Sequence, residues 1–298
     1  MKKIVGVGAC VLDTLIECDN YPIEDKKFRA NSILKTGGGP VANALVVASK
    51  LGIETEFLGA LSKDVDGKFL IDEFDRYGVD TKNIKKIDGV NAFVSYVILS
   101  KNLGSRTCVF NRGSLPDDPK NINFSAIKEA NVLHLDGNYL NCAIESAKFA
   151  KSNGVLVSLD AGGNYEGIEK LLPYVDILIP SEEFALSFTK TEKVETAIKI
   201  LTEKYSPKVL VVTQGKNGGL FVHNEKVYNY DSFKVKCVDS NGAGDTFHGA
   251  FLVAYLNGLS VEECCEFASA TSAIKCTKIG TREALPTIDE VFSFIKSQ

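Results

Sequence analysis

Apolar residues along the chain follow two patterns that alternate from one end to the other. Short runs rich in β-branched and aliphatic residues are typical of buried strands, and segments with apolar residues three or four positions apart are typical of amphipathic helices. The strands are predicted at residues 3–11, 55–62, 130–137, 155–161, 175–180, 208–215 and 233–238. The helices are predicted at residues 41–52, 67–78, 141–154, 191–206, 244–257, 260–279 and 287–296. This alternation indicates an α/β protein with a mostly parallel central sheet flanked by helices.

Two segments, residues 15–36 and 91–113, lack helical periodicity and carry strand-like pieces instead. Neither segment can form a crossover helix, so we expect them to make a small antiparallel sheet beside the main one. Such a sheet over the strand ends would be a lid, because α/β proteins bind ligands there. No linker or repeat interrupts the pattern, and residues 1–298 are predicted to form a single domain.

Composition and charge narrow the class of protein. The 298 residues are 45% hydrophobic and carry a formal net charge of −4, which argues against nucleic acid or an anionic membrane as the main partner. No window approaches the ~18 apolar residues of a membrane span, and the apolar start is interpreted as a first buried strand. Eight cysteines without metal spacing indicate reduced, mostly buried thiols in a cytoplasmic protein.

The most informative stretch is residues 239–251, DSNGAGDTFHGAF. Its glycines allow close approach of the backbone to a ligand, and the free N–H groups of the helix that follows would form an anion site. A phosphoryl group in transfer fits such donors, and Asp245 beside it would take a proton from an attacking hydroxyl. The alternative is a tight strand-to-helix turn in which the aspartate caps the helix.

Three other stretches have both a binding and a structural interpretation. Residues 36–44, TGGGPVANA, could hold a polyol against the backbone with Asn43, or form a turn that starts a helix. Asp13, at the end of the first predicted strand, could take two vicinal hydroxyls or end the strand in a turn. Residues 212–221 could form the wall of a nucleotide pocket or a simple hairpin. The three histidines are interpreted as structural and are His134, His223 and His248.

Motifs of competing classes are incomplete. The GVGACV start lacks the third glycine of a dinucleotide fingerprint, and no G-x-x-x-x-G-K-[ST] sequence occurs. Neither the G-x-S-x-G hydrolase motif nor the H-E-x-x-H metalloprotease motif is present. A nicotinamide oxidoreductase would rest on the incomplete G-x-G alone.

With these residues in hand, the chain resembles the ribokinase/PfkB family of carbohydrate kinases over essentially its whole length. DSNGAGDTFHGAF is similar to the C-terminal signature of the family, D-[TS]-x-G-A-G-D-x-F, and TGGGPVANA is similar to its N-terminal signature. The two stretches lie some 200 residues apart. The resemblance implies a ribokinase-like fold with a lid, and ATP-dependent phosphorylation of a sugar hydroxyl by direct in-line transfer.

The resemblance also implies roles for individual residues. The expected catalytic residues are the base Asp245 and the phosphate-binding Gly242, Ala243 and Gly244. The expected sugar-binding residues are Asp13, Gly38, Gly39, Asn43, Asp136 and Arg106. The expected nucleotide-binding residues are Ser181, Thr213, Gly215, Gly218, Ala270 and Ala273. Mg²⁺ would arrive with ATP, and a monovalent cation such as K⁺ is expected near Asp239 and Gly280.

One departure concerns the metal. The family often shows P-N-x-x-E after the central strand, whereas this chain has PSEEF, with Ser181 and Phe184 at the Asn and Glu positions. Glu182 or Glu183 would then take over the contact with the metal and phosphates, with Asp239 as a further metal candidate.

Residues 104–118, GSRTCVFNRGSLPDD, most resemble the lid segment of ketohexokinases. This resemblance favours a ketohexose such as fructose or an anionic 6-substituted fructose, with Arg106 and Arg112 either meeting an acidic substituent or simply exposed. Lid strands in the family commonly pair between subunits, so a homodimer through the lid is implied. The alternatives are a ribose or adenosine-type nucleoside kinase, and a nucleotide- and sugar-binding sensor without turnover.

Overall fold

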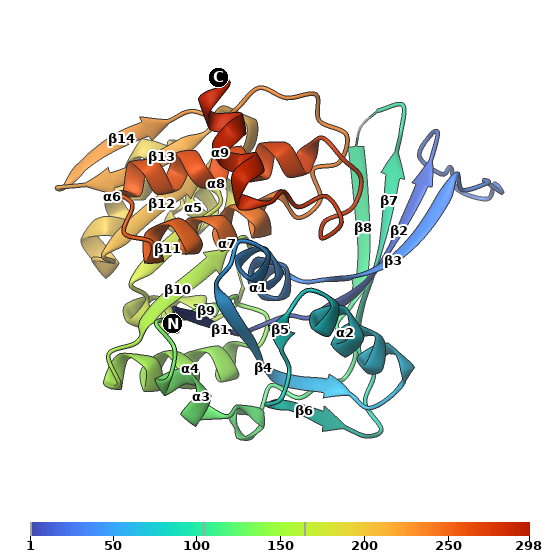
Figure 1. Ribbon diagram of the computed structural model, residues 1–298, viewed down its shortest axis with the longest axis horizontal. Helices are drawn as coiled ribbons and strands as arrows, with labels where there is room; N and C mark the ends of the chain where they lie inside the picture. The colour runs from blue at the N-terminus through green and yellow to red at the C-terminus, as the bar shows by residue number, and fades with distance from the viewer. Residues whose placement is uncertain (1, 104, 164) are drawn as a thin grey trace.

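The structure is a computed structural model that describes residues 2–103, 105–163 and 165–298. A main sheet runs through the molecule in the strand order β14-β13-β12-β11-β10-β9-β1-β4-β5, with β6 pairing β4 (Figure 1). In this spatial order, neighbouring strands from β12 along to β5 pair in parallel, and β13 and β14 add an antiparallel edge. The strands are β1 (Lys3–Val7), β4 (Glu54–Ser62), β5 (Val79–Asp80), β6 (Ile84–Ile87), β9 (Val132–Leu135), β10 (Leu156–Ala161), β11 (Ile177–Pro180), β12 (Val209–Thr213), β13 (Gly219–His223) and β14 (Lys226–Tyr230).

Helices cover both faces of the main sheet, and each face has its own apolar core. One core takes its buried residues from α1 (Pro40–Lys50), α2 (Val65–Arg76), α7 (Ala243–Leu256), α8 (Val261–Cys276) and α9 (Ile288–Lys296). The other takes them from α3 (Phe124–Lys128), α4 (Leu140–Ser152), α5 (Glu182–Thr189) and α6 (Val194–Tyr205). Single 3₁₀ turns are η1 (Pro119–Asn121), η2 (Ile168–Lys170), η3 (Leu172–Tyr174) and η4 (Gly215–Asn217). This arrangement confirms the predicted α/β fold with a mostly parallel sheet.

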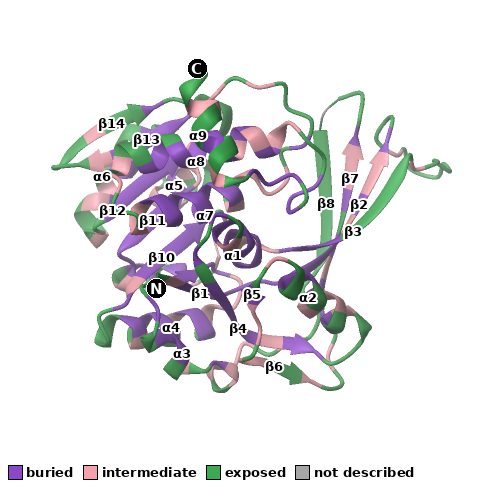
Figure 2. Ribbon diagram, viewed as in Figure 1, coloured by how far each residue is buried: buried purple, intermediate pink, exposed green. Residues whose placement is uncertain are grey.

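A separate small sheet stands beside the main one, in the order β3-β2-β7-β8 (Figure 1). Its strands are β2 (Val11–Cys18), β3 (Ser32–Gly38), β7 (Phe93–Ser100) and β8 (Ser105–Asn111). The sheet is mixed rather than antiparallel as predicted, because β2 and β7 run in parallel. Figure 2 shows that β8, at the edge of this sheet, is exposed along its length. A homodimer through this sheet remains a prediction.

Two of the predicted strands are wrong. The run predicted at residues 3–11 divides into β1 and β2, because the chain crosses at residues 8–10 from the main sheet to the small one. Residues 233–238 form no strand and pair with none of the strands of the main sheet. Phe233 packs instead on Phe294 of α9, with ring centroids 5.2 Å apart.

Helix signals in the sequence were more reliable than strand signals. Capping boxes, which the sequences Ser260-x-x-Glu263 and Thr287-x-x-Glu290 indicate, form at the starts of α8 and α9. Pro40 lies in the first turn of α1, where a proline is well tolerated. None of the helices in the described parts of the chain is long and apolar enough to span a membrane.

Candidate active site

The turn at residues 239–244 presents the N-terminus of α7. Asp239 holds this turn together, since its Oδ1 accepts from the Asn241 N–H at 2.8 Å and its Oδ2 from the Gly280 N–H at 3.0 Å. Gly242 has φ +72° and a Cβ there would lie 2.1 Å from Thr281 Cγ2, so glycine is required. The backbone N–H groups that open α7 are therefore held in a fixed arrangement suited to an anion.

Asp245 is not the cap of α7. The N-cap residue is Gly242, and Asp245 lies in the first helical turn with its Oδ2 accepting a hydrogen bond from Asn43 Nδ2 at 2.7 Å. Burial raises the pKa of Asp245 to about 6, helped by the nearby Asp160 carboxylate, while the hydrogen bond from Asn43 acts in the opposite direction. A carboxylate of this pKa is suited to take up a proton near neutral pH.

Close packing of α1 on α7 brings Asn43 and Asp245 together. At Gly249, one turn beyond Asp245, a Cβ would lie only 2.5 Å from the backbone oxygen of Ala44. The absence of a side chain at Gly249 thus permits the approach of two helices some 200 residues apart in the sequence. The two glycine-rich stretches of the chain meet at this contact.

Arg282 fixes the orientation of the Asn43 amide. Its Nε donates to Asn43 Oδ1 at 3.0 Å, and because arginine is only a donor, the Asn43 nitrogen is left for Asp245. The Arg282 side chain is fully buried, stacks 5.5 Å over the Phe74 ring and lies 3.8 Å from Glu73 Oε2. Its Nη1 and Nη2 have no hydrogen-bond partner among the described residues. Such unpaired buried donors are costly and are typical of functional sites.

Asp13 lies in the middle of the small sheet and not at the end of the first strand. It pairs with Thr36 of β3 and Ser95 of β7, and its Oδ1 accepts from Ser95 Oγ at 2.5 Å. Burial raises the pKa of Asp13 to about 6, against the hydrogen bond from Ser95. A Cβ at Gly38 would lie 1.9 Å from Asp13 Oδ2, so this glycine leaves room for the carboxylate.

Gly39 lies at the start of α1, close to the crossing between the two sheets. Its φ is +98°, and an added Cβ would lie 2.4 Å from the backbone oxygen of Ala9. Asp136, expected at the sugar, is almost fully buried, and its oxygens accept from the N–H groups of Ala9 at 2.9 Å and Asn138 at 2.8 Å. Asp136 therefore holds the backbone of the crossing in this structure.

A cavity of about 510 Å³ opens next to the N-terminus of α7. It is large enough for a cofactor-sized ligand. Of the residues expected at the nucleotide, the cavity is lined by Thr213, Gly215, Gly218 and Ala273. Ala243 and Gly244 line it as well, so the cavity adjoins the anion site. Ala270, on the same helix as Ala273, is fully buried in the core.

The stretch at residues 212–221 forms the predicted hairpin and also lines the cavity, while its contact with a nucleotide remains a prediction. β12 and β13 form an antiparallel hairpin, and Gly218 at its turn has φ +78°. The same turn lines the cavity through Gly215 and Gly218.

The residues expected near the metal are dispersed. Ser181 caps α5 through the Phe184 N–H at 3.1 Å, and Phe184 is buried in the core, which explains why no carboxylate occurs there. Glu182 Oε1 accepts from Gln214 Nε2 at 2.7 Å, beside the cavity turn, whereas Glu183 is exposed. Within the described ranges, no group of three or more histidines, cysteines, aspartates or glutamates is placed to hold a metal ion.

Arg106 connects the small sheet to the α7 turn. Its Nη1 donates to Ser240 Oγ at 2.8 Å, although 134 residues separate them. Arg112 lies elsewhere, with its Nη1 3.3 Å from the Asn138 oxygen and its guanidinium 5.6 Å from the Tyr165 ring centroid. The two lid arginines thus have different surroundings, and Arg106 is the one beside the anion site.

Three further buried side chains lie close to the site, although the sequence did not predict a place for them there. Arg282 and Lys275 lie in and just after α8, and each is fully buried. Burial lowers the pKa of Lys275, while the Asp239 carboxylate acts in the opposite direction. His248, interpreted from the sequence as structural, has its Nε2 3.3 Å from Asp160 Oδ1 and packs on the ring of His134. No local sequence signal identifies these groups, because their partners come from distant segments.

The cysteines are mostly buried, as predicted. All eight cysteines are free thiols in the described chain, but Cys108 and Cys237 are exposed.

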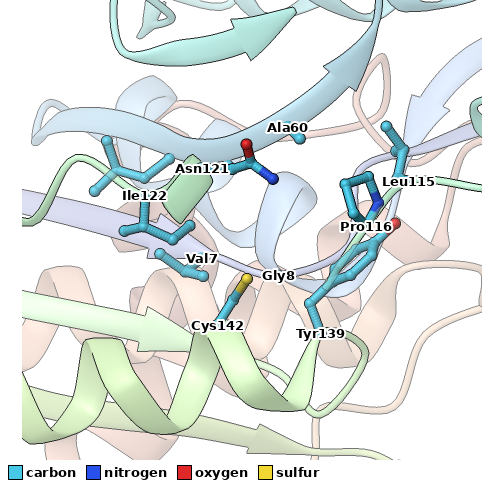
Figure 3. A pocket seen from close by; sticks show the side chains of 11 residues that line it. Val7, Gly8, Ala60, Leu115, Pro116, Asn121, Ile122, Tyr139 and Cys142 are labelled. Atoms are coloured by element: carbon cyan, nitrogen blue, oxygen red, sulfur yellow. The ribbon is translucent and has the colours of Figure 1, made fainter. Parts of the chain in front are cut away.

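A separate small hollow lies between β1, α4 and the segment near Pro116, as Figure 3 shows. At about 20 Å³ it has room for about one water molecule and is too small for a substrate.

Comparisons with known proteins show the family to which the chain belongs. The family model described as "pfkB family carbohydrate kinase" matches residues 1–288. A 5-dehydro-2-deoxygluconokinase from Clostridium beijerinckii is 28% identical over 99% of this chain and 93% of its own length. A fructokinase-5 from Arabidopsis thaliana, described as probable, is 27% identical over 99% of this chain and 98% of its own.

The solved structure of Arabidopsis thaliana ribokinase, complexed with ribose and ATP, superimposes with a TM-score of 0.85 at 27% identity. The match covers 99% of this chain and 98% of that one. The finer resemblance to ketohexokinases remains a prediction, since the relatives named here are other sugar kinases. The chain therefore belongs to the pfkB family of carbohydrate kinases and is an ATP-dependent sugar kinase.

Proposed function

We propose that the enzyme phosphorylates a ketohexose, such as fructose or an anionic 6-substituted fructose, with Asp245 as the general base. The observation that carries the role of Asp245 is the 2.7 Å hydrogen bond from Asn43 to Asp245, which joins the two glycine-rich stretches at one point. The choice of a ketohexose rests on the resemblance of residues 104–118 to the lid segment of ketohexokinases. One Asp245 oxygen is held by Asn43, so the other can accept the proton of the sugar hydroxyl.

Transfer then needs no covalent enzyme intermediate. The sugar oxygen attacks the terminal phosphorus of ATP, its proton passes to Asp245, and the bond from that phosphorus to the bridging oxygen breaks to release ADP. The backbone N–H groups of Gly242, Ala243 and Gly244 would stabilise the charge on the transferring phosphoryl group. Their fixed positions at the start of α7 support this role.

The adjoining cavity supports binding of the nucleotide there. Its lining includes Lys216 and Lys234, which supply positive charge for phosphates, and Phe233, which supplies apolar surface for a base. Mg²⁺ would arrive with ATP and neutralise phosphate charge, bound mostly through phosphates and water. The residue we propose for contact with this ion is Glu182, because it lies beside the cavity turn through Gln214.

The sugar would lie between Asp13 and Asp245. Asp13 is a buried carboxylate that can accept from two hydroxyls, and Gly38 and Gly39 leave the backbone beside it uncovered. Arg106, which reaches the α7 turn from the small sheet, would meet an anionic substituent or a phosphate. Ribose is the second candidate, because relatives that are named ribokinases are about as similar as the fructokinase.

The test is a kinase assay of the purified protein with ATP and Mg²⁺ on fructose, fructose 6-phosphate, ribose, adenosine and 5-dehydro-2-deoxygluconate. We expect turnover with a ketohexose, and Asp245→Asn should lower kcat by about 10²- to 10⁴-fold. Asp72→Asn, at an exposed position of α2, is the matched control and should keep kcat near that of the wild type.

Undiminished turnover of Asp245→Asn would exclude the proposed base. Ribose or adenosine as the preferred acceptor would replace the ketohexose. Thermal stabilisation by sugars and ATP without any turnover would favour a sensor over an enzyme.

A further inference from the structure

Lys275, in the last turn of α8, places its ammonium directly against the turn before α7. Its Nζ donates to the backbone oxygen of Asp239 at 2.8 Å and lies 3.8 Å from Asp239 Oδ2. The side chain is fully buried. Lysines are almost never fully buried unless they are paired, so these Asp239 oxygens define the position of the charge.

The residue that Lys275 contacts also organises the anion site. Asp239 accepts the N–H groups of Asn241 and Gly280, and Thr281, next to Gly280, fills the space beside Gly242. The ammonium therefore lies where three segments meet: the end of α8, residues 280–281 and the turn at residues 239–244. A change in this charge should alter the turn that presents the backbone N–H groups of α7.

A monovalent cation was expected at this very place, near Asp239 and Gly280. Such an ion is held by carbonyl and carboxylate oxygens that replace its hydration shell. Here the backbone oxygen and Oδ2 of Asp239 already face Lys275 Nζ. An ion on the same oxygens would lie beside a charge of the same sign, which is unfavourable at such short range. The residues present do not fit the ion.

We infer that the Lys275 ammonium permanently replaces the monovalent cation and that the enzyme works without K⁺. An ammonium is a compact charge with three donors, so it can bridge carbonyl and carboxylate oxygens much as a bound ion would. This inference rests on the proposed function, because catalysis is one of its readouts. It adds a property that the kinase activity alone does not imply.

The first test compares the wild-type enzyme in chloride salts of potassium, sodium and tetramethylammonium, each at about 0.1 M so that screening is equal. We expect kcat and the KM for ATP to be the same in all three salts. A several-fold rise of kcat that is specific to potassium would overturn the inference. This comparison needs no variant, so it does not depend on how well a substituted protein folds.

The second test removes the ammonium. Lys275→Ala leaves space beside Asp239, and we expect kcat to fall by about 10- to 100-fold in tetramethylammonium chloride as the turn loses its shape. Potassium should restore part of this loss, because the ion can enter where the ammonium was. Lys275→Met fills the same space without charge and should not be rescued. Equal rescue of both variants, or of neither, would overturn the inference.

The matched control is Lys278→Met, which removes an exposed lysine three residues away. It should behave like the wild type in every salt. Melting temperatures give a readout without catalysis: potassium should raise that of Lys275→Ala and leave the wild type unchanged, because only an ion bound to the folded state stabilises it. A wild-type enzyme inactive on every sugar in every salt would refute the proposed function, while these melting temperatures would still test the role of Lys275.

Discussion

The two sides of Asp245 are built in different ways. On one side, residues 239–244 form a turn whose geometry comes from the backbone: Gly242 has a positive φ and Asp239 accepts the N–H of Asn241 two residues on. On the other side, Asn43 reaches Asp245 from α1, and Arg282 reaches Asn43 from the segment after α8. The first side is contiguous in sequence, and the second is assembled from distant segments.

Both sides nevertheless depend on a buried cation from one short stretch of the chain. Lys275 supports the turn at residues 239–244, and Arg282 supports Asn43. The difference is in what each cation contacts: a backbone oxygen and its carboxylate in the first case, and a side-chain amide in the second. Changes on the Asn43 side should therefore affect the orientation of the base, and changes on the Lys275 side the anion site.

Among the changes around Asp245 that leave Asp245 itself in place, the largest effect should come from Arg282→Lys. The variant keeps the charge near Glu73 but loses the planar donor that orients the Asn43 amide, and we expect kcat to fall by about 100-fold. The KM for ATP should change little, because Arg282 does not line the cavity beside α7 in which we propose that ATP binds. Steady-state kinetics with the preferred sugar measures both constants.

The control for this prediction is Arg76→Gln. Arg76 also pairs with Glu73, at 3.4 Å, but it is largely exposed and does not contact Asn43. Its removal should leave kcat within about twofold of the wild type, as for other surface changes. If Arg282→Lys is folded and equally active, then Arg282 does not act through Asn43.

A smaller effect is expected on the pH dependence of kcat/KM, which reports the pKa of Asp245. Asp245 must be ionised to accept a proton, and its pKa of about 6 means that kcat/KM should fall about tenfold for each unit below pH 6. Because the hydrogen bond from Asn43 lowers this pKa, Asn43→Ala should move the midpoint to higher pH. Besides Asn43, the groups that act on Asp245 are Asp160, His248 and Asp13.

The measurement is kcat/KM between about pH 5 and 8 for the wild type and Asn43→Ala, at constant ionic strength. A profile of the wild type that stays flat down to pH 5 would show that burial does not raise the pKa of Asp245 from its ordinary value of 3.8. If Asn43→Ala leaves the midpoint unchanged, then the Asn43 amide does not influence the pKa of Asp245.

The smallest effect should be on stability, from alanine at two glycines of α7. Gly249→Ala pushes a Cβ toward the Ala44 oxygen of α1 and should lower the free energy of unfolding by about 1–3 kcal/mol. Gly244→Ala meets no atom within 4 Å and should be neutral or stabilising by roughly 0.5–1 kcal/mol. Urea denaturation compares the two, and equal effects would mean that close packing of α1 on α7 is not required.

The sequence was informative wherever a structural cause is local. The capping boxes at Ser260 and Thr287 and the glycine turn at Gly242 follow from neighbouring residues, and all form. The sequence was misleading where the structure of a segment depends on residues far away in the chain. The apolar run at residues 3–11 cannot reveal that the chain changes sheets within it, and residues 233–238 look like a strand but have no partner strand.

By itself, the sequence determined most of the alternation of strands and helices, the glycine turn before α7 and the family, because periodicity, backbone conformation and motifs depend on adjacent residues. Only the tertiary structure decided which side chains meet at Asp245. Lys275 and Arg282 look like surface cations in the sequence, yet both are fully buried because Asp239, Asn43 and Glu73 lie against them. A buried charge needs partners, and packing brings them from distant parts of the chain.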